Sequence, residues 1–555
     1  MAYLQPRTEL RTHSVENQSG PLEGLNAFEN DIALKEAVRR GRASWAEANL
    51  TSLGAKIYDP AWMERAELAN RVTPELKRFD RFGRRVDTVE FHPAYHDIIG
   101  MAFQHDLHAL AARETRPGAH VARSAAELMF AQLECGVLCP IDITYGVIPM
   151  LRMHQPDLAE QWVPLMLSQD YDPRPIPHWE KTGVTIAFTS TEKQGGSDIR
   201  RNSTFATPVG EPGPGREYLI RGHKWFCSAA GADVIFVVAQ AEKGPSCFLV
   251  PRWLPDGSRN PIQLERLKEK MGNRSNASTE LEFENTHGWM VGEEGRGIPT
   301  VMEFMRHTRL GCGFIPAGIM RMALTQSIHH TRHRSAFQRR LVDQPLMRNV
   351  LADLAIESEA ATTLMMRVAE SFDGHAHDPH ERAFGRISVA VGKYWINKRV
   401  VPFVHECMDT HGGAGYIEES PIARYFRESP LNGIWEGPGN VISLDILRAF
   451  RREPESGEAF FAELNRVKGE SAPLDAEIRD LAERVRDSEL SDLTARHLAE
   501  RMAIALQASL LLRHAPEAVS EAFLRTRLCR EGGTCFGALP ADIKFDAILE
   551  RALPE

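Results

Sequence analysis

The stretch Thr191-Glu-Lys-Gln-Gly-Gly-Ser-Asp198 says most about the fold of this 555-residue chain. It is a polar turn with two adjacent glycines, and a glycine lets the backbone approach a bound group closely because it has no side chain. Such a turn suits a phosphate or a flat cofactor. Taken alone, however, the same residues are explained more simply as a plain β-turn.

A second stretch, Ile434-Trp-Glu-Gly-Pro-Gly-Asn440, places one carboxylate, Glu436, between bulky apolar residues and glycines. Shielding from water raises the pKa of a carboxyl group, and a carboxylate with a raised pKa can act as a general base. Alternatively, Glu436 caps a helix, since Gly-Pro-Gly-Asn can open one directly after it. Together with the residues between them, the two stretches suggest a flavin-dependent enzyme that removes a proton next to a carbonyl.

The composition is that of an ordinary globular protein, with 43% hydrophobic and 25% charged residues. A chain of this length is too long for one core, so several packed units are expected. No apolar run approaches the roughly 18–20 residues that a membrane span needs. The first twenty residues lack the apolar centre of a secretory signal. We therefore expect a cytoplasmic protein with no membrane association.

Neither the overall charge nor the cysteine pattern gives a signal for nucleic acid or for zinc. The net charge of −9 lacks the overall basic character of a nucleic-acid-binding chain. The eight cysteines form neither a CxxC motif nor a zinc pattern, so reduced thiols are expected. His92 and His96 are four residues apart but lack an HExxH context, so no metal site is expected.

Apolar periodicity changes along the chain. It is helical between about 90 and 170, and the proline-rich stretch Asp172–Pro177 reads as a linker. Between about 183 and 300, short β-branched runs such as Val234–Val238 are separated by turn signals, which is typical of a small β-domain. A helical period then returns and continues to the end.

Two apolar stripes support the helices of the second half. Leu346, Val350 and Leu354 follow at steps of four, after a proline that suits a first helical turn. A later stripe contains Leu498, Met502, Leu506 and Leu510. The predicted fold class is therefore α+β, mainly α. Its four parts are an N-terminal helical domain with an extension (1–180), a β-domain (181–300), a helical bundle (301–450) and an additional helical domain (451–555).

These motifs, in this order, resemble the acyl-CoA dehydrogenase superfamily over roughly residues 90–450. Thr191–Asp198 is similar to the family's flavin-binding Thr-Glu-x-x-x-Gly-Ser-Asp loop, and Gly222–Ser228 resembles the loop that packs an aromatic and a hydroxyl residue on the flavin ring. The other matching motifs are Lys270–Ser278, Val291–Gly297, Arg334–Phe337, His411–Tyr416 and the Glu436 stretch.

The resemblance is greater still to one branch, the AidB-like adaptive-response flavoproteins. The Lys-Gln-Gly-Gly form of the flavin loop, Leu267–Ala277, Phe91–His96 and the block after residue 450 are all similar to that branch. This resemblance implies an N-terminal α-helical domain, a central β-barrel domain, a C-terminal helical bundle and an extra C-terminal helical domain. It also implies a homotetramer.

The implied cofactor is FAD, and the implied reaction is α,β-dehydrogenation of an acyl-CoA thioester, with Glu436 as the base. Arg309 matches an arginine beside the substrate pocket, although a surface salt bridge explains it nearly as well. The residues expected to bind the cofactor are Thr191, Gly196, Ser197, Phe226, Ser228, Arg334, Phe337, Gln344, Gly412, Gly413 and Asn440.

Some of these assignments depart from the family pattern or have simpler alternatives. Phe226 and Ser228 replace the usual Trp and Thr but keep the type of contact; core packing is the alternative for Phe226. Arg334 and Phe337 match residues that reach the adenine dinucleotide of a neighbouring subunit, whereas Arg334 could also be a solvated charge in a basic run. Pro438, Asn440 and Asp409 stand where many relatives have Thr, Gln and Gln, so the flavin contacts there must differ.

In the AidB branch the C-terminal block is associated with duplex DNA, which gives an alternative function: a DNA-binding flavoprotein of the alkylation response with weak dehydrogenase activity. Phosphate contacts need local cations rather than a net positive domain. The candidate DNA-binding residues are Arg513, Arg525, Arg527 and Arg530. The alternative is that these arginines pair with nearby carboxylates such as Glu517, Glu521 and Glu531.

Overall fold

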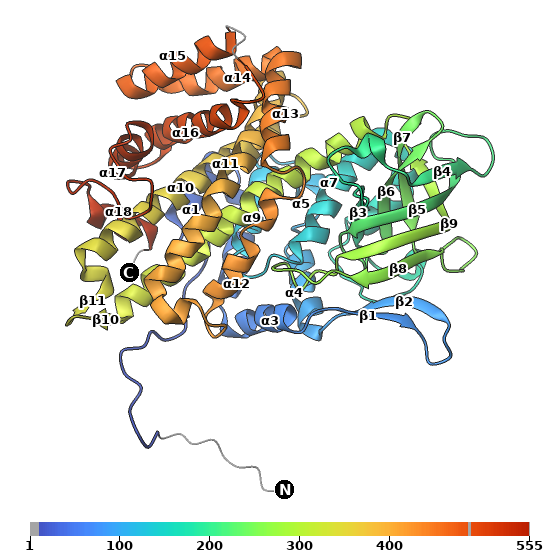
Figure 1. Cartoon of the computed structure of the whole chain (residues 1–555), viewed down its shortest axis with the longest axis horizontal. Coiled ribbons are helices and arrows are strands. Elements are labelled where there is room, and N and C mark those ends of the chain that lie inside the picture. Colours follow the sequence, from blue (N-terminus) through green and yellow to red (C-terminus); the bar gives the residue numbers. More distant parts are fainter. Residues whose placement is uncertain (1–9, 487–489, 554–555) are drawn as a thin grey trace.

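A computed structural model describes residues 10–486 and 490–553 of the chain. Figure 1 shows a helical body with a β-domain at one end. The first described residues project below the helical body in this view, and the chain then joins the body before the first helix.

The N-terminal part is helical apart from one hairpin that the sequence analysis did not predict. Asp31, Asp59 and His92 accept backbone N–H bonds at the starts of α1, α3 and α4, which satisfies donors that a helix leaves unpaired. The elements are α1 (Ile32–Arg40), α2 (Glu47–Ile57), α3 (Pro60–Arg71), β1 (Glu75–Phe79), β2 (Arg85–Glu90), α4 (Pro93–Gln104), α5 (Leu110–Arg113), α6 (Ala119–Phe130), α7 (Leu138–His154) and α8 (Pro156–Met166).

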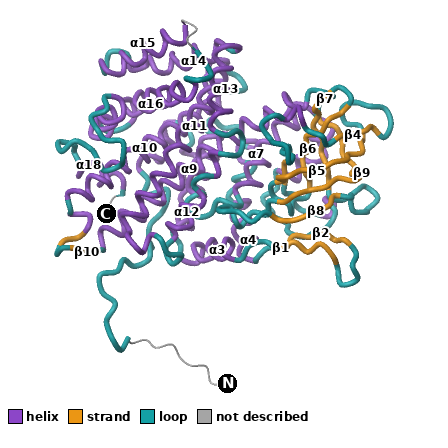
Figure 2. Tube along the Cα trace, in the orientation of Figure 1, coloured by secondary structure: helices purple, strands orange, loops and turns teal. Residues whose placement is uncertain are grey.

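The β-domain closes into a barrel, as expected. Its strands are β3 (Ile186–Thr189), β4 (Phe205–Pro208), β5 (Glu217–Cys227), β6 (Val234–Ala241), β7 (Gly244–Pro251), β8 (Ile262–Leu267) and β9 (Thr279–Val291). The order β6-β4-β5-β9-β7 returns to β6, because β7 also pairs with β6. Strand β3 extends the sheet parallel to β6, and β8 lies beside β9. Figure 2 shows these strands grouped at one end of the molecule.

Long helices form the bundle. They are α9 (Gly297–His333), α10 (Pro345–Gly374) and α11 (Pro379–His411), followed by α12 (Pro421–Glu428) and α13 (Gly439–Arg452). A small hairpin, β10 (Ser335–Ala336) and β11 (Arg339–Arg340), joins α9 to α10. One detail of the predicted stripe is wrong: Leu354 is buried, but Leu346 is 82% exposed in the first turn of α10.

The last part of the chain adds α14 (Pro454–Leu464), α15 (Ala472–Arg486), α16 (Ala495–His514), α17 (Glu517–Phe523) and α18 (Phe545–Ala552). The predicted stripe Leu498, Met502, Leu506 and Leu510 is buried in α16. These side chains belong to the same apolar cluster as the interiors of α10 and α11. The block is therefore built onto the bundle rather than around a separate core.

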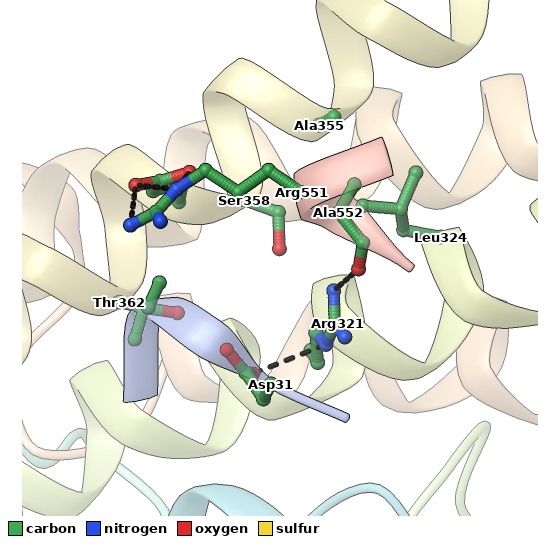
Figure 3. Close-up of a pocket in the computed structure, with 10 residues that line it drawn as sticks. Asp31, Arg321, Leu324, Ala355, Ser358, Thr362, Arg551 and Ala552 are labelled. Carbon is green, nitrogen blue, oxygen red and sulfur yellow. Dashed lines mark hydrogen bonds and ion pairs between the residues drawn. The ribbon is translucent and has the colours of Figure 1, made fainter. Parts of the chain in front are cut away.

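Helix α1 in the N-terminal part and α18 in the C-terminal part are both fastened to α9 and α10 (Figure 3). Arg321 of α9 forms an ion pair with Asp31 at 3.1 Å and donates to the Ala552 carbonyl at 2.6 Å. Arg551 pairs with Glu36 and Glu359. Within the described residues, no helix is both long and apolar enough to cross a membrane.

Short 3-10 turns and one π-helical turn complete the described structure. They are Ser44–Ala46, His178–Glu180, Ile199–Arg201, Leu341–Asp343, Gly412–Gly415, Leu431–Gly433, Asn465–Val467 and the π-helical Leu524–Leu528.

Candidate active site

The stretch Thr191–Asp198 follows β3 and is anchored by one buried ion pair. Glu192 lies 2.8 Å from the Lys224 ammonium and also accepts the backbone N–H groups of Ser203 and Thr204. Burial lowers the pKa of Lys224 to about 8, although Glu192 opposes this shift. The turn is open at Gly195, where a Cβ would meet no atom within 4 Å.

The end of β5 lies directly beside this turn. The Trp225 N–H donates to the Thr191 carbonyl, and the Thr189 hydroxyl donates to the Phe226 carbonyl, both at 2.8 Å. Phe226 is 42% exposed, so core packing does not account for it. The Lys268 ammonium lies 4.7 Å from the centre of its ring. Ser228, half-buried, follows the end of the strand.

Glu436 lies in a turn directly before α13 with a left-handed φ of +55°, unusual for a residue other than glycine. Its Oε2 atom is buried and has no hydrogen-bond partner. Burial raises the pKa of this carboxyl group, while Arg309 and Lys393 act in the opposite direction. No side chain caps α13, so the helix-cap alternative for Glu436 is wrong.

Two buried cations brace the Glu436 turn. The Arg309 Nε donates to the Glu436 carbonyl at 3.1 Å, and Lys393 donates to the carbonyls of Asn432 and Gly437 at 2.9 Å. Arg309 also forms a buried ion pair with Asp445 at 3.0 Å. Arg309 is therefore not a surface salt bridge. Lys393 was missed, because a lysine inside a long helix carries no sequence signal for this role.

The two stretches that opened the sequence analysis come together. Trp435 packs in the same apolar cluster as Phe188, which lies shortly before Thr191 in the chain. The rings of Phe188 and Phe304 are 4.6 Å apart. Phe304 lies on α9, just over one turn before Arg309. Both stretches therefore border one apolar cluster that α9 and the barrel strands share.

The second group of predicted cofactor residues lies elsewhere, at the far end of α9. Arg334 follows α9, Phe337 forms the tip of the β10–β11 hairpin, and Gln344 donates to the Ala336 carbonyl directly before α10. His330 stacks on His411 at 4.6 Å, which brings the hairpin close to the glycine turn after α11. In that turn, a Cβ on Gly412 or on Gly413 would meet no atom within 4 Å.

Arg309, beside the Glu436 turn, and Arg334 of the second group lie far apart within one chain. Arg309 and Arg334 lie on the same helix and its cap, about 37 Å apart at about 1.5 Å per residue. That separation is longer than a dinucleotide cofactor. It fits the expectation that Arg334 and Phe337 reach a cofactor held by a neighbouring subunit.

The remaining predicted cofactor residues are accessible. Ser197 is exposed at the end of the glycine turn, and Asn440 is exposed in the first turn of α13. Gly196 has a packing role, since a Cβ there would lie 2.5 Å from the Thr191 hydroxyl oxygen.

The residues present fit a flavin dinucleotide. The junction between α9 and the barrel offers an accessible aromatic ring, an open glycine turn and a buried carboxylate oxygen without a partner. The hairpin end offers an arginine beside two open glycines. No metal-binding group of three or more His, Cys, Asp or Glu side chains occurs among the described residues.

Most of the arginines proposed for DNA binding pair with carboxylates of the same chain. Arg513 pairs with Glu463 at 2.6 Å, and Arg525 pairs with both Glu531 and Asp542. Arg527 is nearly buried and pairs with Asp353 and Glu357 of α10. Arg530 is exposed. Of the carboxylates that the sequence suggested as partners, Glu531 forms an ion pair with Arg525, whereas Glu517 forms one with Lys544.

Three family models match the chain in succession. Residues 17–173 match the adaptive response protein AidB N-terminal domain, residues 187–286 match the acyl-CoA dehydrogenase middle domain, and residues 295–450 match the acyl-CoA dehydrogenase C-terminal domain.

Individual proteins agree with these models. The Escherichia coli (strain K12) protein AidB, an acyl-CoA dehydrogenase by name, is 42% identical over 86% of this chain and 87% of its own. Acyl-CoA dehydrogenase family member 11 of Caenorhabditis elegans is 26% identical over 84% of this chain and 78% of its own.

A solved structure of Caenorhabditis elegans ACDH-11 in complex with C11-CoA shares the fold. Its TM-score is 0.85, with 24% identity, over 95% of this chain and 94% of that one. The order of the domains, the geometry at both ends of α9 and these likenesses agree. The chain belongs to the acyl-CoA dehydrogenase family, in its AidB branch, and is by family an FAD-dependent oxidoreductase.

Proposed function

We propose that this protein dehydrogenates an acyl-CoA thioester between its α and β carbons, with Glu436 as the base. The observation that carries the proposal is the buried, unpartnered Oε2 of Glu436 at the junction with the glycine turn. A carboxylate oxygen without a hydrogen bond retains its capacity to accept a proton. Its raised pKa brings it closer to the range in which a general base works at neutral pH.

The chain's own residues then have defined tasks. Arg309 and Lys393 hold the backbone of the Glu436 turn, so the carboxylate keeps its direction while it accepts the α-proton. Trp435 packs beside it and excludes water. Bound FAD supplies the hydride acceptor, with Thr191, Phe226 and Ser228 lining its ring site. Arg334 and Phe337 reach the dinucleotide of a neighbouring subunit.

Three further proposals concern substrate, assembly and place. Because the related ACDH-11 was solved in complex with C11-CoA, acyl-CoA thioesters of that length are the first substrates to test. The separation between Glu436 and the Arg334 hairpin favours an assembly of several chains, and we propose a homotetramer. We propose the cytoplasm as its location, as expected from the sequence.

The substitution Glu436→Gln tests the reaction. It keeps the shape of the side chain but removes the base, so we expect acyl-CoA-dependent bleaching of the flavin to slow at least about a thousandfold. FAD content should stay unchanged. The measurement is anaerobic stopped-flow absorbance at the flavin maximum with a panel of acyl-CoA thioesters.

Glu455→Gln, an exposed glutamate at the start of α14, is the matched control and should bleach at the normal rate. If Glu436→Gln is reduced as fast as the unchanged protein, Glu436 is not the base. If no thioester bleaches the unchanged protein, dehydrogenation is not its function.

Duplex-DNA binding by residues 451–555 is the competing proposal. It ranks second because Arg513, Arg525 and Arg527 are engaged by carboxylates. Titrating the same preparation with duplex DNA at rising salt separates the two proposals. Binding that weakens steeply with salt would favour the DNA role.

A further inference from the structure

The N-terminal segment Asn17–Gly20, called the strap below, is fastened to the end of α9. The side chain of Asn17 forms a two-point contact with Ser335, donating to its carbonyl at 2.8 Å and accepting its N–H at 2.7 Å. The Arg334 guanidinium donates to the Asn17 carbonyl at 2.6 Å. Asn17 therefore contacts the two residues at which the chain leaves the helix.

The next residues of the strap form hydrogen bonds with the last turns of α9. The Ser19 hydroxyl lies 3.0 Å from His330 Nδ1, and the Gly20 carbonyl lies 2.9 Å from His329 Nε2. His330 is the residue that stacks on His411. The strap thus meets the corner that holds Arg334 and the glycine turn after α11.

The hairpin under the strap is conformationally strained. Phe337 and Gln338, the two residues of its tip, both have left-handed φ values, +51° and +64°. A tip with two positive φ values is a type I′ turn, which favours Asn and Gly. A bulky Phe is unfavourable in that conformation, so the surrounding structure must hold it there. Phe337 is nevertheless 94% exposed, which points to a contact outside its own chain.

Hydrogen bonds within the hairpin region fix its internal shape, but they do not fix its orientation relative to the rest of the molecule. The Leu341 N–H donates to the Arg334 carbonyl at 2.8 Å, and Gln344 donates to the Ala336 carbonyl at 2.9 Å. Both hydrogen bonds lie within residues 334–344, called the arm below. The bonds from Asn17 and Ser19 instead connect the arm and the helix end to a separate segment.

We propose that the strap positions the arm, so that the N-terminal segment of each subunit sets how firmly FAD is held in the neighbouring subunit. The inference rests on the proposed function, in which Arg334 and Phe337 reach the neighbour's dinucleotide. Asn17 is a positioning residue: it orients Arg334 and Ser335 and does not itself contact the cofactor. The bond from Arg334 to Asn17 uses one N–H of the guanidinium and leaves its other donors available for a phosphate.

The test is the affinity of the full-length, flavin-stripped protein for FAD, followed by flavin fluorescence. Asn17→Ala removes both side-chain bonds to Ser335, and we expect the Kd for FAD to rise about tenfold, on the scale of one or two neutral hydrogen bonds. The matched control is Gln18→Ala, its exposed neighbour, which has no hydrogen bond among the described residues. It should bind FAD normally.

Mixed assemblies show in which subunit the strap acts. Gly196→Val spoils a chain's own flavin turn, because a Cβ there meets the Thr191 hydroxyl oxygen at 2.5 Å. When Asn17→Ala is on the same chain as Gly196→Val and the partner is unchanged, the partner's FAD should be weakly held. When the two changes are on different chains, the remaining FAD site should have normal affinity.

Each outcome has a separate meaning. Normal FAD affinity in Asn17→Ala overturns the strap proposal and leaves the proposed function standing. If FAD is weakly held when Asn17→Ala is on the chain with the intact flavin turn, the strap acts within its own subunit. The proposed action between subunits is then wrong. If the unchanged protein does not rebind FAD at all, the proposed function fails, and this proposal fails with it.

Discussion

At the scale of single residues, the environment of Glu436 decides its chemistry. The sequence supplies one carboxylate between Trp435 and Gly437. Whether it is a base depends on its burial, which raises its pKa, and on the cations Arg309 and Lys393, which limit the rise. These cations donate their hydrogen bonds to backbone carbonyls of the turn rather than to the carboxylate, so they direct the group without neutralising it.

Replacing Lys393 by Met separates these effects. The loss of a positive charge raises the pKa of Glu436 further, and the turn loses two hydrogen bonds. Since a base must be ionised to act, activity is lost as pH falls through its pKa. We therefore expect the acidic limb of the pH–rate profile to move to higher pH, and the limiting rate to fall about tenfold.

The measurement for Lys393→Met is the rate of flavin reduction between pH 5 and 9. Lys468→Met, an exposed lysine of the C-terminal block, is the control and should leave the limb in place. An unchanged limb in Lys393→Met would contradict the electrostatic role of Lys393.

At the scale of elements, one aspartate joins three helices around the site. Asp445 of α13 is buried and forms ion pairs with Arg309 of α9 and Arg386 of α11. Burial alone would raise the pKa of Asp445, but the two arginines lower it below its ordinary value. Helix α13 starts just after Glu436, so this cluster of ion pairs fixes the position of the Glu436 turn.

Asp445→Asn should therefore destabilise the helical body. It leaves two cations without their shared carboxylate, and breaking a buried pair costs about 3–5 kcal/mol. We expect the midpoint of thermal unfolding of the FAD-bound protein to fall by at least about 5 °C. Asp480→Asn, which removes a half-exposed partner of Arg501, is the control and should change the midpoint by about 1 °C or less. Equal shifts in the two variants would contradict the special role of Asp445.

At the scale of the whole molecule, buried ion pairs fasten the C-terminal block to the bundle. Burial alone would raise the pKa values of Glu357 and Glu463, but neighbouring arginines lower both to about 2. Glu357 pairs with Arg527, and Glu463 pairs with Arg367 and Arg513. Arg513 and Arg527, two of the arginines proposed to bind DNA, thus have a structural task.

These two pKa values predict how stability depends on pH. A group whose pKa is depressed on folding stabilises the protein above its ordinary pKa and loses that effect as pH falls towards the folded value. Each glutamate should therefore contribute on the order of 3 kcal/mol that is lost between about pH 4.5 and pH 2. Thermal unfolding across this range should show a steep fall in midpoint, and the fall should be shallower in Glu463→Gln. Equal slopes in this variant and in Glu455→Gln would contradict the prediction.

How much could be predicted from the sequence follows from the range of each interaction. Local patterns suffice for the barrel strands, for α16 and for the glycine turn, because periodicity and turn chemistry act over a few residues. The β1–β2 hairpin was missed, since its strands are mostly polar on both faces. Leu346 was wrongly expected to be buried. The apolar period identifies a stripe along the helix, but it does not show how far the neighbouring helix covers that stripe.

By itself, the sequence determined the family and the succession of helical and β parts, and it singled out Glu436 as the proposed base, because short motifs and their order can be read without knowledge of the fold. Tertiary structure alone decided that Arg309 and Lys393 brace the Glu436 turn, that three C-terminal arginines are paired, and that Asn17 meets Ser335. Each of these contacts joins residues far apart in the chain, up to 318 positions in the last case. No local pattern encodes such a contact, since it forms only when packing brings the two segments together.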